Sequence, residues 1–220
     1  MDEYKLGAFV CTASFQEPAF NLCQQSAGLH KALFRNLRDL GPRFDNFTET
    51  GTSSGAAHWS LTLLIPGRGS FRATAQNFES TFLNPGVELP STVATILQQV
   101  ESAVAEAIPE ATIQTRQFVL NAHFALPPGT YQALTAAFLR EPPSGLGVPW
   151  AQGMTFYFHT PDSRVASALT LDRSVAVLDG LFFQARSHID AQRSDLVSSI
   201  ADFQAFLGTA IASAKVGGMV

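Results

Sequence analysis

The sequence predicts an α+β protein in which a bent antiparallel sheet packs against helices. Segments of strand length with alternating apolar residues follow one another, and turn sequences such as Pro66-Gly67 separate them. Two longer segments, near Val93 and near Leu196, repeat apolar residues every three or four positions, as amphipathic helices do. The sequence lacks the regular alternation of strands and helices that is typical of a parallel sheet, which favours pairing as hairpins.

The first half of the chain begins with a predicted strand over Leu6–Phe15 and a helix over Phe20–Leu40, which Gly41-Pro42 ends. Three strands are expected next, spanning residues 44–50, 59–65 and 71–83. Alternation in the last of them changes phase near Asn77, and this predicts a β-bulge or a strong bend within one strand.

A helix closes the first half, because apolar residues follow Ser91, a plausible N-cap, at spacings of four, three and four. These residues are Val93, Leu97, Val100 and Val104. Pro109 ends the helix, since proline cannot continue it.

The second half repeats this order. A strand over Thr112–Leu126 alternates clearly, and Thr130 is a candidate N-cap for a short helix that ends before Pro142. Three strands are expected at residues 154–159, 165–171 and 174–189, with turns at Pro161-Asp162 and Asp172-Arg173. The last helix carries an apolar stripe formed by Leu196, Ile200, Phe203, Leu207 and Ile211.

Both halves therefore read as β-α-β-β-β-α, and we expect residues 1–110 and 111–220 to form a pseudo-duplicated pair within one compact domain. At the level of the fold alone, this order resembles the helix-grip and TATA-binding-protein-like pseudo-symmetric folds. No motif supports a closer family identity, and the resemblance implies no functional residues.

Composition excludes some partners. The net charge of −4 and the lack of a Lys/Arg run argue against nucleic acid, which requires a concentrated basic face. No apolar run reaches the roughly 20 residues that span a bilayer, so no membrane partner is expected. Cys11 and Cys23 are too few for a disulfide scaffold or a metal site. Together with an N-terminus that lacks a long apolar region, they predict a soluble cytoplasmic protein.

One sequence resembles a catalytic motif. Residues 51–55 match G-x-S-x-G, in which Ser53 would be the nucleophile of a serine hydrolase. A strand-like segment follows Gly55, whereas the nucleophile elbow requires a helix, so a loop is the favoured interpretation. The histidines lack metal-ligand spacing, and no phosphate-binding loop is present. We therefore predict no catalytic residue, no metal and no cofactor.

Polar or amphipathic side chains do occur within the mostly apolar strands. If several face a cavity between sheet and helices, they would orient a ligand there; otherwise they coat the exposed face of the sheet. The candidate ligand-binding residues are Trp59, Arg72, Arg116, His123, Tyr157, Arg186 and His188.

The function predicted from these features is non-enzymatic binding of a small apolar ligand or of another protein. Its motivation is the abundance of phenylalanine, with 18 copies, and the low proportion of charged residues, 15%. One alternative is a homo-oligomeric assembly subunit, for example a homodimer that pairs through sheet edges. The other is a serine hydrolase that uses Ser53.

Overall fold

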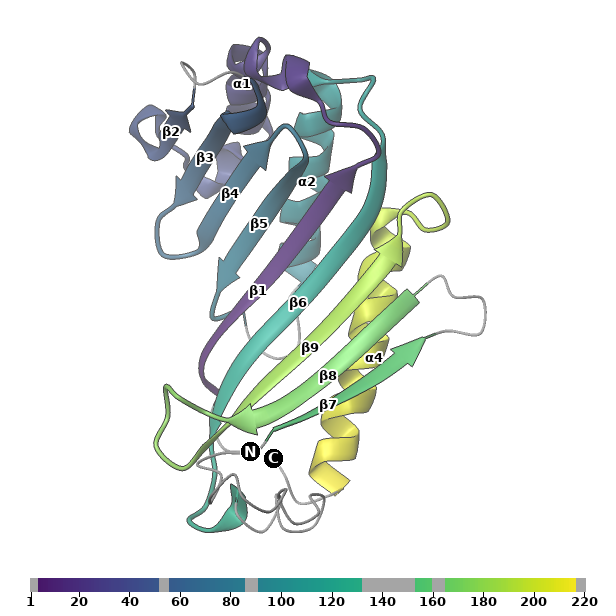
Figure 1. Ribbon diagram of the computed structural model, residues 1–220. Coiled ribbons are helices and arrows are strands. Elements are labelled where there is room, and N and C mark those ends of the chain that lie inside the picture. Colours follow the sequence, from purple (N-terminus) through teal and green to yellow (C-terminus); the bar gives the residue numbers. More distant parts are fainter. Residues whose placement is uncertain (1–3, 52–55, 86–90, 132–152, 160–164, 217–220) are drawn as a thin grey trace, which may run out of the picture.

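A computed structural model describes residues 4–51, 56–85, 91–131, 153–159 and 165–216 of the chain. It contains one nine-stranded sheet with the order β2-β3-β4-β5-β1-β6-β9-β8-β7, and all neighbouring strands are antiparallel (Figure 1). The strands are β1 (Tyr4–Phe15), β2 (Phe47–Thr50), β3 (Ser60–Ile65), β4 (Gly69–Thr74), β5 (Asn77–Leu83), β6 (Ile113–Ala125), β7 (Met154–His159), β8 (Val165–Arg173) and β9 (Gly180–Asp190). This confirms the predicted α+β class with an antiparallel sheet.

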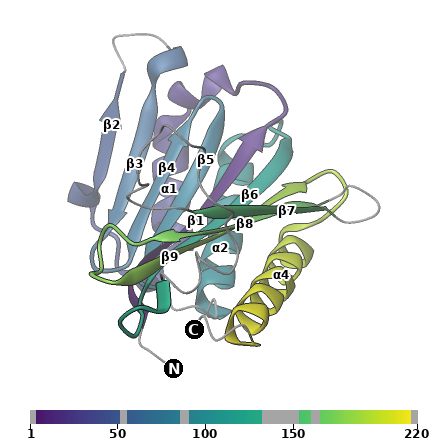
Figure 2. The same cartoon turned by 60° about the horizontal axis from the view of Figure 1, so that its bottom comes forward.

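Three helices pack on the same face of this open, twisted sheet (Figures 1 and 2). They are α1 (Ser26–Asn36), α2 (Ser91–Ala107) and α4 (Leu196–Val216). We call the side that they cover the helix face and the opposite side the open face. Within the described residues, no helix is both long and apolar enough to cross a membrane.

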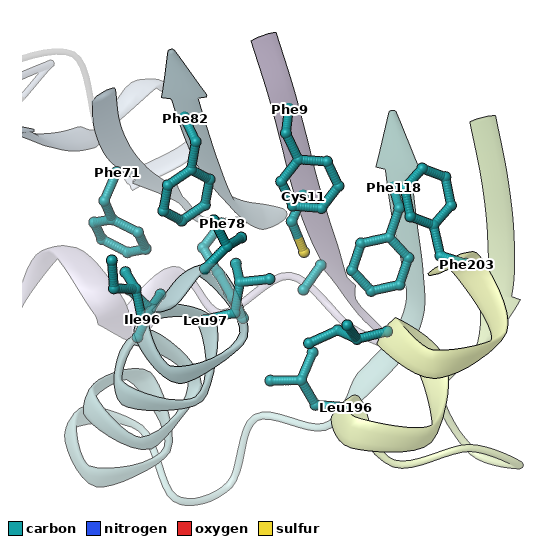
Figure 3. Packing of buried hydrophobic residues seen from close by; sticks show 14 of the residues in the cluster. Phe9, Cys11, Phe71, Phe78, Phe82, Ile96, Leu97, Phe118, Leu196 and Phe203 are labelled. Carbon is teal, nitrogen blue, oxygen red and sulfur yellow. The ribbon is translucent and has the colours of Figure 1, made fainter. Parts of the chain in front are cut away.

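The centre of the sheet joins the two halves of the chain, because β1 pairs with β6. Phenylalanine rings fill the space between these strands and the two long helices (Figure 3). The ring centroids of Phe9 and Phe118 lie 6.0 Å apart, and Phe203 from α4 lies 5.8 and 5.6 Å from them. Burying each of these side chains contributes roughly 1.5–3 kcal/mol. Both halves thus contribute to one continuous core.

Both long helices form where the apolar spacing predicts them. In α2 the predicted stripe, Val93 to Val104, is buried against the sheet, and so are Leu196 to Leu207 in α4. The predicted helix over Phe20–Leu40 is shorter, since 3-10 turns at Phe20–Cys23 and Arg38–Leu40 flank α1. Gly41 ends it in the left-handed conformation, with φ of 66°, as expected for a C-cap glycine.

The prediction of a single strand over residues 71–83 is wrong, because β4 and β5 are separate strands joined by a tight turn. Thr74 Oγ1 accepts hydrogen bonds from the backbone N–H groups of Gln76 and Asn77, at 3.2 and 3.1 Å, and holds the turn closed. The change of phase at Asn77 therefore marks a reversal of the chain, and the first half contains one strand more than predicted.

The turn predicted at Asp172-Arg173 is also misplaced. Strand β8 continues to Arg173, and the reversal occupies the residues before Gly180. Ser174 Oγ accepts hydrogen bonds from the N–H groups of Ala176 and Val177, at 3.2 and 2.8 Å, and Asp179 takes a positive φ of 52°. The short helix predicted after Thr130 and the loop from Pro142 lie almost wholly outside the described residues.

Candidate functional site

Arg116, one of the candidate ligand-binding residues, lies on the helix face and is 6% exposed. Its Nε and Nη2 atoms donate to the two carboxylate oxygens of Glu101 on α2, at 2.8 and 3.1 Å. Its Nη1 donates to the carbonyl oxygen of Ser194, which precedes α4, at 2.7 Å. Arg116 therefore ties both long helices to the central strand β6, and its hydrogen-bonding groups face the protein interior.

Trp59 also faces the interior. It is 1% exposed, and its indole N–H donates to the carboxylate of Glu49 on β2. A buried indole N–H needs such an acceptor, so the pair anchors the outer strands of the sheet. Neither Trp59 nor Arg116 lies where a ligand on the open face would touch it.

Three candidate residues gather at one end of the open face. Strand pairing places Tyr157 on β7 and Arg186 on β9 on either side of Ala168 on β8. With strands spaced about 4.8 Å apart, their Cα atoms are roughly 10 Å from each other. His188 follows Arg186 on the same face of β9, and all three side chains are exposed. They form a polar and aromatic patch around the small residues Ala166 and Ala168 of β8.

The other two candidates on the open face lie elsewhere. Arg72 on β4 and His188 on β9 lie in the same row of paired residues that runs across the sheet. Three strands, β5, β1 and β6, lie between them, so their Cα atoms are about 19 Å apart. His123 on β6 lies in another row, where its Nδ1 is 2.8 Å from the Ser174 hydroxyl and its ring is 5.1 Å from that of Phe182. The seven candidates therefore do not converge on one site.

Ser53, through its sequence motif, and Cys11, through its thiol, are two candidate nucleophiles of the chain. Residues 52–55, including Ser53, lie outside the described residues. Burial raises the pKa of the Cys11 thiol, and the nearby Glu101 carboxylate raises it further, so this cysteine is a poor nucleophile. Within the described ranges, no group of three or more His, Cys, Asp or Glu side chains could hold a metal ion.

Two hollows on the described surface are large enough for a small ligand. One lies between the sheet edge and α4, with a volume of about 470 Å³, and we call it the edge groove. It is lined by Phe158, His159, Val165, Ser167, Leu169, Asp202, Ala205, Phe206, Thr209 and Ala210.

The second hollow, of about 930 Å³, lies between α1 and the segment that leads into β2. We call it the basic groove, because four of its lining residues are cationic and none is acidic. It is lined by Ala27, His30, Lys31, Phe34, Arg35, Arg38, Pro42, Arg43, Phe44 and Phe47.

Aromatic rings make up the apolar part of the basic groove. Phe34 on α1 is 47% exposed and Phe44 is 82% exposed, although residues of this kind are usually buried. The His30 ring meets Phe47 edge-on, with centroids 4.8 Å apart. His30 Nε2 is closed off from solvent and has no hydrogen-bond partner among the described residues.

Two of the four cations in the basic groove have an acidic neighbour. Arg35 forms an ion pair with Glu106 on α2, and Arg38 lies 3.9 Å from Asp39 in a highly exposed pair. Lys31 and Arg43 form no ion pair within the described part of the chain. The groove therefore combines exposed aromatic surface with positive charge that nearby carboxylates only partly compensate.

Comparison with known proteins adds no assignment to this geometry. No family model matches the chain, and no curated protein or solved structure is significantly similar to it.

Proposed function

We propose that this protein is a non-enzymatic binding protein whose ligand is a small anionic amphiphile held in the basic groove. The observation that carries the proposal is the lining of that groove: exposed phenylalanines beside four cations and no carboxylate. An apolar body would contact the rings, and an anionic group would pair with the rim. The proposed ligand site is distinct from the seven residues that the sequence suggested.

The size and apolar character of the groove support a small ligand. Its volume of about 930 Å³ lies within the roughly 300–1,000 Å³ that is usual for ligand pockets. Phe34 and Phe44 keep much of their surface in water in the unliganded chain. Covering that surface stabilises a complex by about 25 cal/mol for each Å² of apolar area removed from water.

Charge supports an anionic ligand over a neutral one. The chain carries a net charge of −4, yet four of its 14 Lys and Arg residues line this groove. Such a local excess of positive charge raises the concentration and the association rate of anions at the groove. Lys31 and Arg43, which lack carboxylate partners among the described residues, are the residues that we expect to contact the anion.

His30 provides a further reason for a polar group on the ligand. A buried polar atom without a partner costs about 1–3 kcal/mol, and His30 Nε2 is such an atom. A ligand oxygen that reaches Nε2 would recover part of this cost. The His30 side chain lines the groove, so the required movement is local.

Isothermal titration of the protein with dodecanoate, kept below its aggregation concentration, tests the proposal. Dodecanol and dodecylammonium share the chain length but lack the negative charge, and we expect both to bind more weakly. Replacing both Lys31 and Arg43 with glutamine should weaken dodecanoate binding about twofold to thirtyfold, since two exposed ion pairs at roughly 0.2–1 kcal/mol each contribute about 0.4–2 kcal/mol together. Phe34→Ser should weaken the binding of all three ligands, because it removes apolar surface that each alkyl chain would contact.

Arg72→Gln is the matched control, because it removes one exposed cation from the open face and leaves the basic groove unchanged. It should leave dodecanoate affinity within error of the wild type. Equal affinities for dodecanoate and dodecanol would contradict the anionic part of the proposal. Binding of a glutamate-rich peptide without any binding of dodecanoate would assign the groove to a protein partner.

We further propose that the two halves of the chain derive from one duplicated unit. The sheet order supports this, since β1 and β6 lie at its centre and each half fills one side of the sheet. A cytoplasmic location is likewise a proposal, which the free thiols of Cys11 and Cys23 support.

A further inference from the structure

Strand β7 is an edge of the sheet and carries unusual side chains for that position. It pairs with β8 alone among the described strands, and its sequence from Met154 to His159 contains no Asp, Glu, Lys, Arg or Pro. Phe156, Tyr157 and Phe158 are 40%, 76% and 47% exposed. Proteins commonly protect edge strands with charge, proline or short length, since an open edge pairs with other strands.

The opposite edge of the sheet shows that protection. Strand β2 has four residues, against six in β7. It also carries Glu49, whose carboxylate is held by the Trp59 indole. The two edges therefore differ in length, charge and aromatic content, and only β7 presents an apolar strand that could continue the sheet.

We propose that a second copy of this chain pairs with β7 in antiparallel orientation, so that two sheets join into one. Residues that face each other across a strand pair share one face of the sheet. If the two-fold axis passes through one residue of β7, each residue lies opposite one from the same face of the sheet in the second copy. If the axis passed between two residues, helix-face residues would lie opposite open-face residues. Tyr157 is the central residue of the three exposed aromatic residues. With the axis at Tyr157, each of the three lies opposite an aromatic residue of the second copy.

This register has consequences on both faces. On the open face Tyr157 lies opposite Tyr157 of the second copy, and Thr155 lies opposite His159. On the helix face Phe156 lies opposite Phe158 of the second copy. Phe158 already contacts Phe206 of α4, with ring centroids 5.8 Å apart. The apolar surface of the edge groove thus continues directly into the proposed interface, and no like charges oppose each other.

The available area makes the dimer a weak one. An aromatic side chain buries about 150–250 Å², so the exposed fractions of these three residues amount to about 300 Å² for each copy. Two copies together would bury about 600 Å² of aromatic surface, with the paired backbone and the groove rim added. Stable interfaces bury about 1,200–2,000 Å² in total, and smaller ones belong to transient complexes. A dissociation constant in the micromolar range is therefore expected.

Sedimentation velocity between 1 and 200 µM tests the interface, and three variants at one position test its register. Wild type should change from monomer to dimer across this range. Tyr157→Lys and Tyr157→Glu each place like charges opposite each other, and each should raise the dissociation constant at least tenfold. An equimolar mixture of the two variants should form dimers again, because Lys then faces Glu.

Val175→Lys is the control, since Val175 is 86% exposed and lies outside β7. It should dimerise as the wild type does, and circular dichroism should show that all variants are folded. A wild type that stays monomeric at 200 µM would overturn the proposal, and so would dimers that resist both Tyr157 variants. Failure of the mixture to dimerise, when each variant alone is monomeric, would overturn the Tyr157-centred register.

Discussion

Replacing Arg116 with methionine should destabilise the protein more than any change at an exposed residue. The arginine side chain is 8% exposed and its Glu101 partner is 17% exposed, so the ion pair is largely desolvated. The variant keeps the apolar length of the side chain but removes two hydrogen bonds to Glu101 and one to the Ser194 carbonyl. It also leaves the mostly desolvated Glu101 carboxylate without a counter-charge.

The expected cost is about 3–5 kcal/mol, which is typical for breaking a buried pair by removing one partner. This is a large part of the roughly 5–15 kcal/mol that stabilises an ordinary domain. Most of this loss of stability comes from the Glu101 carboxylate, which no longer has a positively charged partner. Adding Glu101→Met to the Arg116→Met variant should therefore restore about 2 kcal/mol, and the unpaired Ser194 carbonyl accounts for the remaining loss of about 1–3 kcal/mol.

Urea denaturation of the wild type, both single variants and the double variant at pH 7 measures these free energies of unfolding. Far-ultraviolet circular dichroism and tryptophan fluorescence should give coincident transitions, since Trp59 reports on the core near β3. The double variant should be more stable than Arg116→Met alone. A cost below about 1 kcal/mol for Arg116→Met, or purely additive effects of the two changes, would refute the assignment of a desolvated ion pair.

Two further predictions concern single ionisable groups. Hydrogen bonds to its carboxylate, first that from the backbone N–H of Ser198, hold the pKa of Asp195 below its ordinary value. The capping contribution is therefore fully present above that ordinary pKa and is lost as pH falls through the folded-state pKa. Asp195→Ala should therefore lower the melting temperature more at pH 7 than at pH 2, whereas Asp195→Asn keeps a neutral cap. A difference that persists undiminished at pH 2 would contradict this. Because burial raises the pKa of the Cys11 thiol, a disulfide reagent should modify only Cys23 in the native protein and both thiols in guanidinium, and two rapidly reacting thiols in the native state would be inconsistent with the structure.

Periodicity predicts the large elements of this fold well, because both long helices carry a regular apolar stripe that the core requires. Their buried faces are the ones that the spacing from Val93 and from Leu196 indicates. Periodicity does not distinguish a bulge from a reversal of the chain. The turn after Thr74 depends on one hydroxyl oxygen that accepts hydrogen bonds from two backbone N–H groups, which the alternation of apolar residues does not reveal.

Odd- and even-numbered residues of a strand face opposite sides of the sheet, and this alternation predicts which face each candidate residue lies on. Arg116 shares its parity with Phe118 and Leu120 on β6, which are fully buried, so its position on the helix face follows from the pattern. His123 has the opposite parity, and the two residues could never have lined one pocket. Which candidates on the open face are neighbours depends on strand order, which local patterns do not encode.

Sequence patterns alone do not predict the basic groove, because its walls come from α1 and from the segment that enters β2. A signal is nevertheless present. Phe34 lies among Lys31, Arg35 and Arg38 within the helix predicted over Phe20–Leu40, and the apolar stripe of that segment, Leu29 to Leu37, is already complete without it. This aromatic residue lies beside a second exposed phenylalanine, Phe44, and it is this combined patch that we propose a ligand covers.

A nuclear magnetic resonance titration of the uniformly ¹⁵N-labelled protein with dodecanoate tests the central claim most directly. If the basic groove holds the anion, the amide resonances that shift will lie in the segment from Ala27 to Phe47, and Lys31→Gln with Arg43→Gln will reduce those shifts at equal ligand concentration. Shifts confined to β7 and α4 would assign the ligand to the edge groove, and an unchanged spectrum would contradict the proposed binding function.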